Sequence, residues 1–222
     1  AGQINGTTGY EEAAAQGMVA GLNAAGLALG AEPCVFGRTN SYIGVMIDDL
    51  TLRGVTEPYR MFTSRAEFRL TLRADNADQR LTPIGVQVGC VRIERQQAFG
   101  KKAESLARAK AALSVGAFSS RELGAVGIQV SQDGARRTAL SVLAFPDVQL
   151  SQVEALVPEF TQFSSEVQRQ VGFDALYAQY QARQNADAAA LQKEEDAMIP
   201  SDFVFNGLPG LSTELTLKLN RI

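Results

Sequence analysis

The sequence predicts a mainly helical protein with a smaller α/β part near its N-terminus. Helical periodicity dominates the chain after residue 82. One predicted helix carries four apolar residues on a single face: Phe99, Ala103, Leu106 and Leu113. Before it, residues 66–73 alternate apolar and polar side chains, which is the period of a half-buried strand. At the start of the chain, a glycine-rich turn leads into a helix of small residues.

Composition narrows the possible chemistry more than charge does. The 222 residues carry a formal charge of −3, so any nucleic-acid contact must come from a local basic patch. The chain has no histidine, which excludes a Ser-His-Asp hydrolase and a histidine-ligated metal site within it. Cys34 and Cys90 have no metal-ligand spacing, so no metal site is predicted. No signal peptide or membrane span is recognisable, and we expect a cytoplasmic protein with no membrane contact.

The N-terminal elements begin with residues 1–6, which look like the end of a strand that enters a turn. Thr7 or Thr8 is the expected N-cap of a helix from about Gly9 to Leu29. The many alanines and glycines of that helix predict that another element packs closely against it. Residues 42–52 are apolar, and their periodicity leaves helix and strand open.

Arginines mark the predicted strand. Arg69 and Arg73 lie on its polar face, and Arg65 precedes it. They either pair with nearby carboxylates on a solvated face or contact a polyanion. The adjacent Asp48 and Asp49 point apart in a helix or a strand, so we interpret them as caps or salt-bridge partners and not as a catalytic pair.

The rest of the chain is predicted to be helical. We place a domain boundary near residue 92, which gives domains 1–92 and 93–222. Thr82 and Pro83 look like the start of one helix, and Ser151 with Glu154 looks like a capping box. The other expected helices are a short one at 137–144, a long one at 163–197 with a possible break at Gly172, and a last one that Ser212 caps and that reaches the chain end.

Two blocks of sequence resemble a known family. These are "AGQINGTTGYEEAAAQG" at residues 1–17 and "EPYRMFTSRAEFRLTLRADNADQRLTPIG" at residues 57–85. They are similar to the glucose-inhibited division protein A family, the FAD-binding subunit of an enzyme that modifies the wobble uridine of tRNA. Phe68 stands where the family usually has tyrosine, and the family's N-terminal GxGxxG fingerprint is absent. The resemblance implies a C-terminal fragment: residues 1–92 would be the end of a Rossmann-like FAD-binding domain, and 93–222 a helical bundle domain for tRNA and partner binding, truncated at its C-terminus.

The resemblance also implies site residues. Gln3 would contact the flavin ribityl chain, because an amide can both accept and donate a hydrogen bond without adding charge. Glycines would let the backbone approach the cofactor closely. The expected FAD contacts are Gln3, Gly2, Gly6, Thr8 and Gly9. The expected tRNA contacts are Arg65, Arg69 and Arg73. Catalytic residues are not identified, because the family's important cysteines lie outside this chain.

The family's activity would be FAD- and folate-dependent addition of a carboxymethylaminomethyl or aminomethyl group at C5 of uridine 34. NADH would reduce FAD, and methylenetetrahydrofolate would supply the one-carbon unit. A GTPase subunit would join a homodimer of the flavoprotein in a heterotetramer, and the fragment alone would be inactive. Two alternatives stay open: a related folate- and FAD-dependent tRNA uridine methyltransferase, which should lack the "EPYRMFTSRAE" block, and a non-catalytic module that binds tRNA or the partner.

Overall fold

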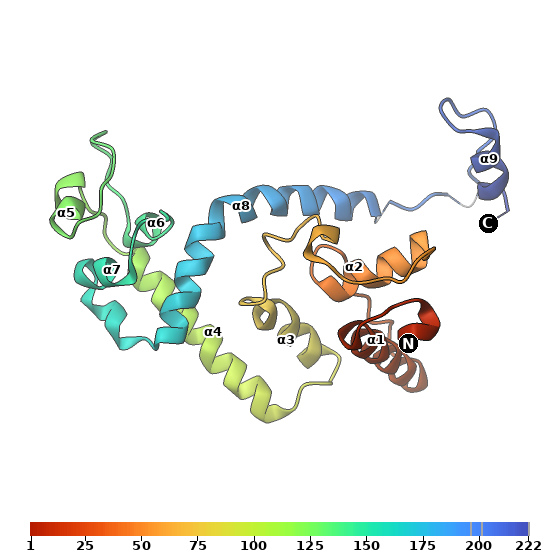
Figure 1. Cartoon of the computed structure of the whole chain (residues 1–222), viewed down its shortest axis with the longest axis horizontal. Coiled ribbons are helices and arrows are strands. Elements are labelled where there is room, and N and C mark those ends of the chain that lie inside the picture. Colours follow the sequence, from red (N-terminus) through yellow and green to blue (C-terminus); the bar gives the residue numbers. More distant parts are fainter. Residues whose placement is uncertain (196, 201, 222) are drawn as a thin grey trace. The chain divides into compact units, whose positions relative to one another are not determined.

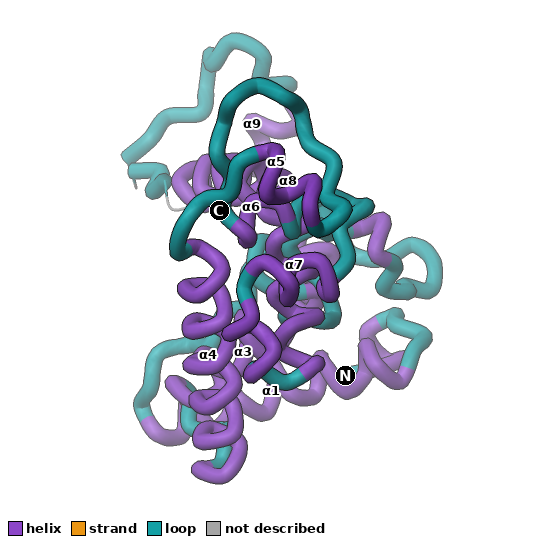
Figure 2. Tube along the Cα trace, turned by 90° about the vertical axis from the view of Figure 1, so that its left-hand side faces the viewer, coloured by secondary structure: helices purple, strands orange, loops and turns teal. Residues whose placement is uncertain are grey.

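The computed structural model describes residues 1–195, 197–200 and 202–221. The chain divides into two compact units, Ala1–Asn185 and Ala186–Ile222. Figure 2 shows helices and loops in the described residues and no strand, so the predicted mainly helical fold is confirmed. Extended pairing in this part of the chain is limited to two isolated bridges, one parallel between Thr7 and Tyr59 and one antiparallel between Phe118 and Arg137.

The helices follow one another as Figure 1 labels them. Those of the first unit are α1 (Tyr10–Leu29), α2 (Tyr42–Asp48), α3 (Ala77–Gln87), α4 (Ile93–Ser114), α5 (Ser120–Ala125), α6 (Ala139–Val142) and α7 (Leu150–Leu156). Helix α8 (Ser165–Glu195) begins in the first unit and extends past Asn185, and α9 (Thr213–Leu219) belongs to the second unit. Short 3₁₀ turns span Gly2–Asn5, Thr63–Arg65 and Pro158–Gln162, and a π-helical turn spans Asp49–Arg53.

The predicted strand at residues 66–73 is wrong. These residues form turns, in which the amides of Thr71 and Leu72 both donate to the carbonyl of Phe68 at 2.9 Å. No neighbouring strand is present in the described residues to pair with the segment. Instead, the Gln184 side chain of α8 accepts from the Thr71 amide at 3.2 Å and donates to the Glu67 carbonyl at 3.0 Å. The alternation of apolar and polar residues therefore reflects a buried turn.

The first six residues also differ from the prediction. Gly2–Asn5 form a 3₁₀ turn and not a strand end. The N-cap position of α1 is Gly9, not Thr7 or Thr8, so no side chain caps this helix. Thr7 is buried, and its hydroxyl accepts a hydrogen bond from the side chain of Gln16. The small-residue face of α1 is open: a Cβ added at Gly17 or Gly21 would meet no atom of the described chain within 4 Å.

Several helices begin or end at residues other than those predicted. The segment with open periodicity is α2 followed by the π-helical turn, and α3 begins at Ala77, which leaves Pro83 inside it. The capping box before α7 is formed by Gln149 with Gln152, not by Ser151 with Glu154. Helix α8 continues through Gly172 without a break. Ser212 caps α9 as predicted, but that helix ends at Leu219, and the predicted chain end at Ile222 lies outside the described residues.

The main apolar core of the first unit lies where α4, α6, α7 and α8 meet (Figure 1). Helix α4 contributes Leu106, Ala109 and Leu113. Of its predicted apolar face, Leu106 and Leu113 are in this core, whereas Phe99 and Ala103 are only partly buried and lie outside it. The other buried members are Ala139, Leu143, Val153, Val157, Phe160, Phe163, Val167, Val171 and Ala175. This core fixes the first half of α8. Gln184, in the second half of the helix, contacts the segment around Thr71.

The second unit, Ala186–Ile222, is small. The rings of its two phenylalanines, Phe203 and Phe205, pack edge to face with 5.1 Å between their centroids. The side chain of Asn220 donates to that of Asn206 at 2.9 Å. Among the helices that the structure describes, none is both long and apolar enough to span a membrane.

Candidate functional site

The glycine loop, residues 1–9, is held from one side by Gln16 of α1. Gly2 and Gly6 have φ angles of +78° and +81°, a left-handed conformation that favours glycine. The Gln16 Oε1 atom accepts from the Gly2 amide at 2.9 Å, and Nε2 donates to the Thr7 hydroxyl at 3.1 Å. Because Gln16 is buried, these bonds are shielded from water, and one amide side chain fixes both ends of the 3₁₀ turn.

Tyr59 holds the same loop from the other side. Its backbone amide donates to the Gly6 carbonyl at 2.7 Å, and its carbonyl accepts from the Thr8 amide at 3.0 Å. Its phenol donates to Asp49 Oδ2 at 2.9 Å. Burial and this hydrogen bond together raise the pKa of Tyr59 above its ordinary value. The phenol therefore stays neutral over the whole range in which proteins are normally studied.

A hollow of about 430 Å³ opens between the glycine loop and residues 55–58. It is lined by Gln3, Gly6, Thr7, Thr8, Val55, Thr56, Glu57 and Pro58. Three predicted cofactor residues, Gln3, Gly6 and Thr8, thus share one wall, whereas Gly2 is buried. A Cβ on Gly6 would lie 2.4 Å from Val55 Cγ2, so glycine is needed for this approach. The exposed amide of Gln3 can donate to and accept from a neutral, hydroxyl-rich ligand. The Thr8 hydroxyl can accept from the same ligand, since its own proton is donated to the Tyr59 carbonyl at 3.1 Å.

Gly9 has a structural reason to be glycine. A Cβ at this position would lie 1.7 Å from a carboxylate oxygen of Glu12 and 1.8 Å from an Arg60 nitrogen. Glu12 is buried, accepts from the Met61 amide at 2.8 Å and pairs with Arg60 at 3.2 Å. Burial alone would raise the pKa of Glu12, but these bonds, and one from its own amide, lower it. The first turn of α1 is therefore tied to the segment after Tyr59.

Arg38 joins three carboxylates beneath this loop. Its guanidinium lies 2.8 Å from Asp48, 2.7 Å from Asp49 and 2.6 Å from Glu67. The interpretation of Asp48 and Asp49 as salt-bridge partners is confirmed. Burial alone would lower the pKa of Arg38, but the three carboxylates raise it above its ordinary value. Sequence reasoning missed Arg38, because a lone arginine in a loop carries no motif.

The three predicted RNA-contact arginines have different surroundings. Arg65 lies over the Tyr59 ring at 4.4 Å and donates to the Arg60 carbonyl. Arg69 is exposed, and no hydrogen bond or ion pair holds its side chain in the described part of the chain. Arg73 has a side chain only 8% exposed, paired with Asp75 at 2.8 Å and with Asp174 at 2.9 Å. Because the strand does not form, these arginines do not present one common face.

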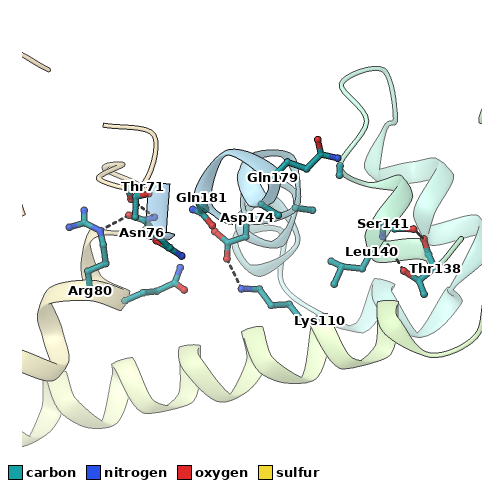
Figure 3. Close-up of a pocket in the computed structure, with 15 residues that line it drawn as sticks. Thr71, Asn76, Arg80, Lys110, Thr138, Leu140, Ser141, Asp174, Gln179 and Gln181 are labelled. Atoms are coloured by element: carbon teal, nitrogen blue, oxygen red, sulfur yellow. Dashed lines mark hydrogen bonds and ion pairs between the residues drawn. The ribbon is translucent and has the colours of Figure 1, made fainter. Parts of the chain in front are cut away.

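A larger cavity of about 650 Å³ lies among α3, α4, α6 and α8 (Figure 3). Its polar walls bond to each other: Lys110 pairs with Asp174 at 2.7 Å, and Arg80 donates to Asn76 at 2.9 Å. Asp174 also receives Arg73, so this cluster joins the turn segment to α4 and α8. We interpret these side chains as a structural joint, that is, a polar cluster that holds the turn segment against α4 and α8.

Comparison with known proteins gives matches at both ends of the first unit. The family model described as "tRNA modifying enzyme MnmG/GidA C-terminal helical domain" matches residues 94–185, and the one described as "Glucose inhibited division protein A" matches residues 1–32. The first of these begins close to the domain boundary expected near residue 92. The second covers the whole glycine loop and α1.

Curated relatives and solved structures match over the whole chain. The "tRNA uridine 5-carboxymethylaminomethyl modification enzyme MnmG" of Granulibacter bethesdensis is 45% identical and that of Zymomonas mobilis 47%, over 100% and 99% of this chain. The structure of Aquifex aeolicus GidA in its form II crystal superposes with a TM-score of 0.78 and 37% identity over 100% of this chain. In all three cases the chain spans 35% of the relative's length.

Proposed function

Because the chain belongs to the MnmG/GidA family, we propose that it forms part of an enzyme that modifies the wobble uridine, U34, of tRNA. The observation that carries this proposal is 45% identity, along the whole chain, to a relative named a tRNA uridine 5-carboxymethylaminomethyl modification enzyme. The proposed reaction adds a carboxymethylaminomethyl or aminomethyl group at C5. Its proposed cosubstrates are NADH as reductant and methylenetetrahydrofolate as one-carbon donor, and its proposed partner is a GTPase subunit, MnmE, that joins a homodimer in the cytoplasm.

The proposed cofactor is FAD, and the hollow beside the glycine loop is proposed as one wall of its site. Bound FAD supplies the redox chemistry of the reaction. Gln3 and Thr8 would hydrogen-bond its hydroxyl groups, and Gly2, Gly6 and Gly9 would keep the loop backbone in place. The exposed Gln3 amide and the close approach of Gly6 to Val55 fit this role. Catalytic residues are not assigned to this chain.

The open face of α1 supports the proposal that residues 1–92 end a Rossmann-like domain. Gly17 and Gly21 lie on this face with free space beside them, and the nearby Met18 is 56% exposed. Small residues let a helix approach a sheet closely, and the relatives are about three times as long as this chain. Their additional length would provide elements that cover α1.

For tRNA contact we propose Arg69 first, because it is the exposed member of the predicted set. Arg65 would contribute through its position over Tyr59, and Arg73 would act indirectly by fixing the turn that presents Arg69. Replacing Arg69 with glutamate should weaken tRNA binding and reduce its salt dependence by about one counterion. Arg108→Glu, an exposed arginine on α4, is the matched control. Equal effects of the two variants on tRNA affinity and salt slope would contradict a specific role for Arg69.

The decisive test is nucleoside analysis. Cells that lack their own enzyme would be supplied with a full-length relative in which this chain replaces the matching 35%, and modified uridines in their tRNA would be measured by mass spectrometry. Restored C5 modification supports the proposal. A non-catalytic binding module is the second candidate, because the chain covers 35% of its relatives and provides one wall of the proposed site. A hybrid protein that shifts tRNA in gels but is colourless and restores no modified uridine would favour that candidate.

A further inference from the structure

A line of polar contacts connects the turn that carries Arg69 with the glycine loop. Glu67 Oε1 lies 2.6 Å from Arg38 Nη2, and Arg38 Nη1 lies 2.7 Å from Asp49 Oδ1. The other oxygen of Asp49 accepts from the phenol of Tyr59 at 2.9 Å. We call Glu67, Arg38, Asp49 and Tyr59 the Arg38 relay. Its last member reaches the glycine loop through its own backbone.

Within the relay, each inner member uses separate atoms for its two neighbours, and Arg38 Nη1 also pairs with Asp48 at 2.8 Å. Arg38 meets Glu67 with one terminal nitrogen and Asp49 with the other, and Asp49 meets Arg38 and Tyr59 with different oxygens. A guanidinium is a planar fork, so moving one of its partners reorients the other. The plane of the Asp49 carboxylate is thus fixed from both sides.

Burial makes these bonds hard to replace with water. Arg38, Asp49 and Tyr59 are 9%, 5% and 4% exposed, and the loss of one partner would leave a buried charge or donor without a bond. Glu67 differs, since its side chain is 52% exposed. The relay therefore has one end in solvent, near Arg69, and the other end in the interior at the glycine loop.

We propose that Arg38 is a positioning residue for the glycine loop, acting through Asp49 and Tyr59, and that Glu67 makes this position sensitive to the turn around Arg69. The Tyr59 amide and carbonyl then transmit the position to Gly6 and Thr8. The inference rests on the proposed function only for what binds at each end, which is RNA at the turn and a flavin at the loop. The coupling itself is a property of the described chain.

The alternative is that these residues only stabilise the fold. A merely structural network would loosen the whole first unit when it is cut, whereas a positioning relay would loosen the glycine loop first. Glu67 distinguishes the two best, because a half-exposed carboxylate contributes little to global stability. Under the proposal, replacing Glu67 should still speed up amide exchange in the glycine loop.

The test is amide hydrogen exchange of the 222-residue chain without any ligand, resolved by NMR. Tyr59→Phe keeps the ring and removes the bond to Asp49, and Glu67→Gln removes the charge at the exposed end. We expect exchange of the Thr8 amide to accelerate about tenfold in Tyr59→Phe and about twofold to threefold in Glu67→Gln. Amides of Leu113 and Val171, in the apolar core, should keep their wild-type rates.

Matched controls are Tyr180→Phe, an exposed tyrosine of α8, and Glu32→Gln, an exposed glutamate after α1. Both should leave the Thr8 amide unchanged. The proposal is overturned if Thr8 exchange is unchanged in both relay variants, or if the core amides accelerate by the same factor. The exchange test needs no FAD, so its failure is separate from failure of the cofactor assignment. FAD binding is measured instead in a full-length relative that carries this chain in place of its matching 35%: no FAD bound there, with the Thr8 response of the 222-residue chain intact, would contradict the cofactor assignment and leave the coupling standing.

Discussion

Asp174 is the residue whose removal should most weaken the joint between the turn segment and the helical bundle. Its carboxylate lies 2.9 Å from Arg73 and 2.7 Å from Lys110, and it accepts from Gln170 at 3.0 Å. Its side chain is 14% exposed and that of Arg73 is 8% exposed. Asp174→Asn keeps the size and one acceptor but removes the charge, so it tests the ion pairs with little change in packing.

The expected loss of stability in Asp174→Asn depends on the partners that Arg73 and Lys110 keep. Breaking a buried ion pair costs about 3 to 5 kcal/mol. Arg73 keeps Asp75 at 2.8 Å, and it also lies over the Tyr177 ring at 4.7 Å, so its charge is not left without a partner. Lys110 is 40% exposed, so its share is near the surface value of about 0 to 1 kcal/mol. We therefore expect Asp174→Asn to lower the free energy of unfolding by about 2 kcal/mol.

Urea unfolding followed by circular dichroism measures this difference. Glu11→Gln is the control, because Glu11 also pairs with an arginine, at 3.4 Å, but is 79% exposed. That variant should change the free energy of unfolding by about 0.5 kcal/mol or less. Added salt should reduce the effect of Glu11→Gln and leave most of the effect of Asp174→Asn. Equal losses in the two variants would refute the reasoning that burial gives this cluster its strength.

Three further predictions concern single side chains. Gly9→Ala should destabilise the chain by about 1 kcal/mol or more, because its Cβ would displace the buried Glu12 carboxylate and its partner Arg60. Gly17→Ala should be neutral or stabilise by up to about 1 kcal/mol, and thermal unfolding compares the two variants. Gln184→Ala removes the bonds to Thr71 and Glu67 and should cost about 1 to 2 kcal/mol, with faster amide exchange confined to that turn. The lowered pKa of Glu12 means that its ionised form contributes to stability in full above its unfolded pKa, and that this contribution is lost as pH falls through the folded pKa. Below about pH 4.5, the free energy of unfolding of Glu12→Gln should therefore fall less steeply with pH than that of the wild type.

Local patterns in the sequence predicted the helical elements well. The apolar spacing of α4, the N-cap of α9 by Ser212 and the long α8 are each set by residues close together in the chain, and the structure has all three. Such signals depend on helix periodicity and on capping chemistry, which act within a few residues.

The failures have a common physical cause. Residues 66–73 alternate like a strand, but the Gln184 side chain, more than 100 residues later, satisfies the backbone that a neighbouring strand would have paired. Arg73 lay on the predicted polar face, but Asp174 draws it into the interior. Arg38 and Gln16 were not singled out, because their partners are distant in sequence. Contacts between distant residues leave no periodic trace in the sequence.

The two halves of the first unit are stabilised by different interactions, and this predicts their order of opening. Most buried polar side chains of the described residues lie before residue 92, whereas most buried apolar ones lie after it. Helix α1 buries only Glu12 and Gln16, while α4 buries three apolar residues in the main core. A buried hydrogen bond contributes about 1 kcal/mol, less than a buried leucine.

Native-state hydrogen exchange in low urea should therefore show α1 amides exchanging through a smaller opening than α4 amides. The gap should be at least about 1.4 kcal/mol, which is a tenfold difference in rate. If the added length of the relatives covers α1 as proposed, this helix gains protection in a longer protein and α4 does not. Equal protection of α1 and α4 in the 222-residue chain would contradict the view that α1 is held mainly by its buried polar residues, Glu12 and Gln16.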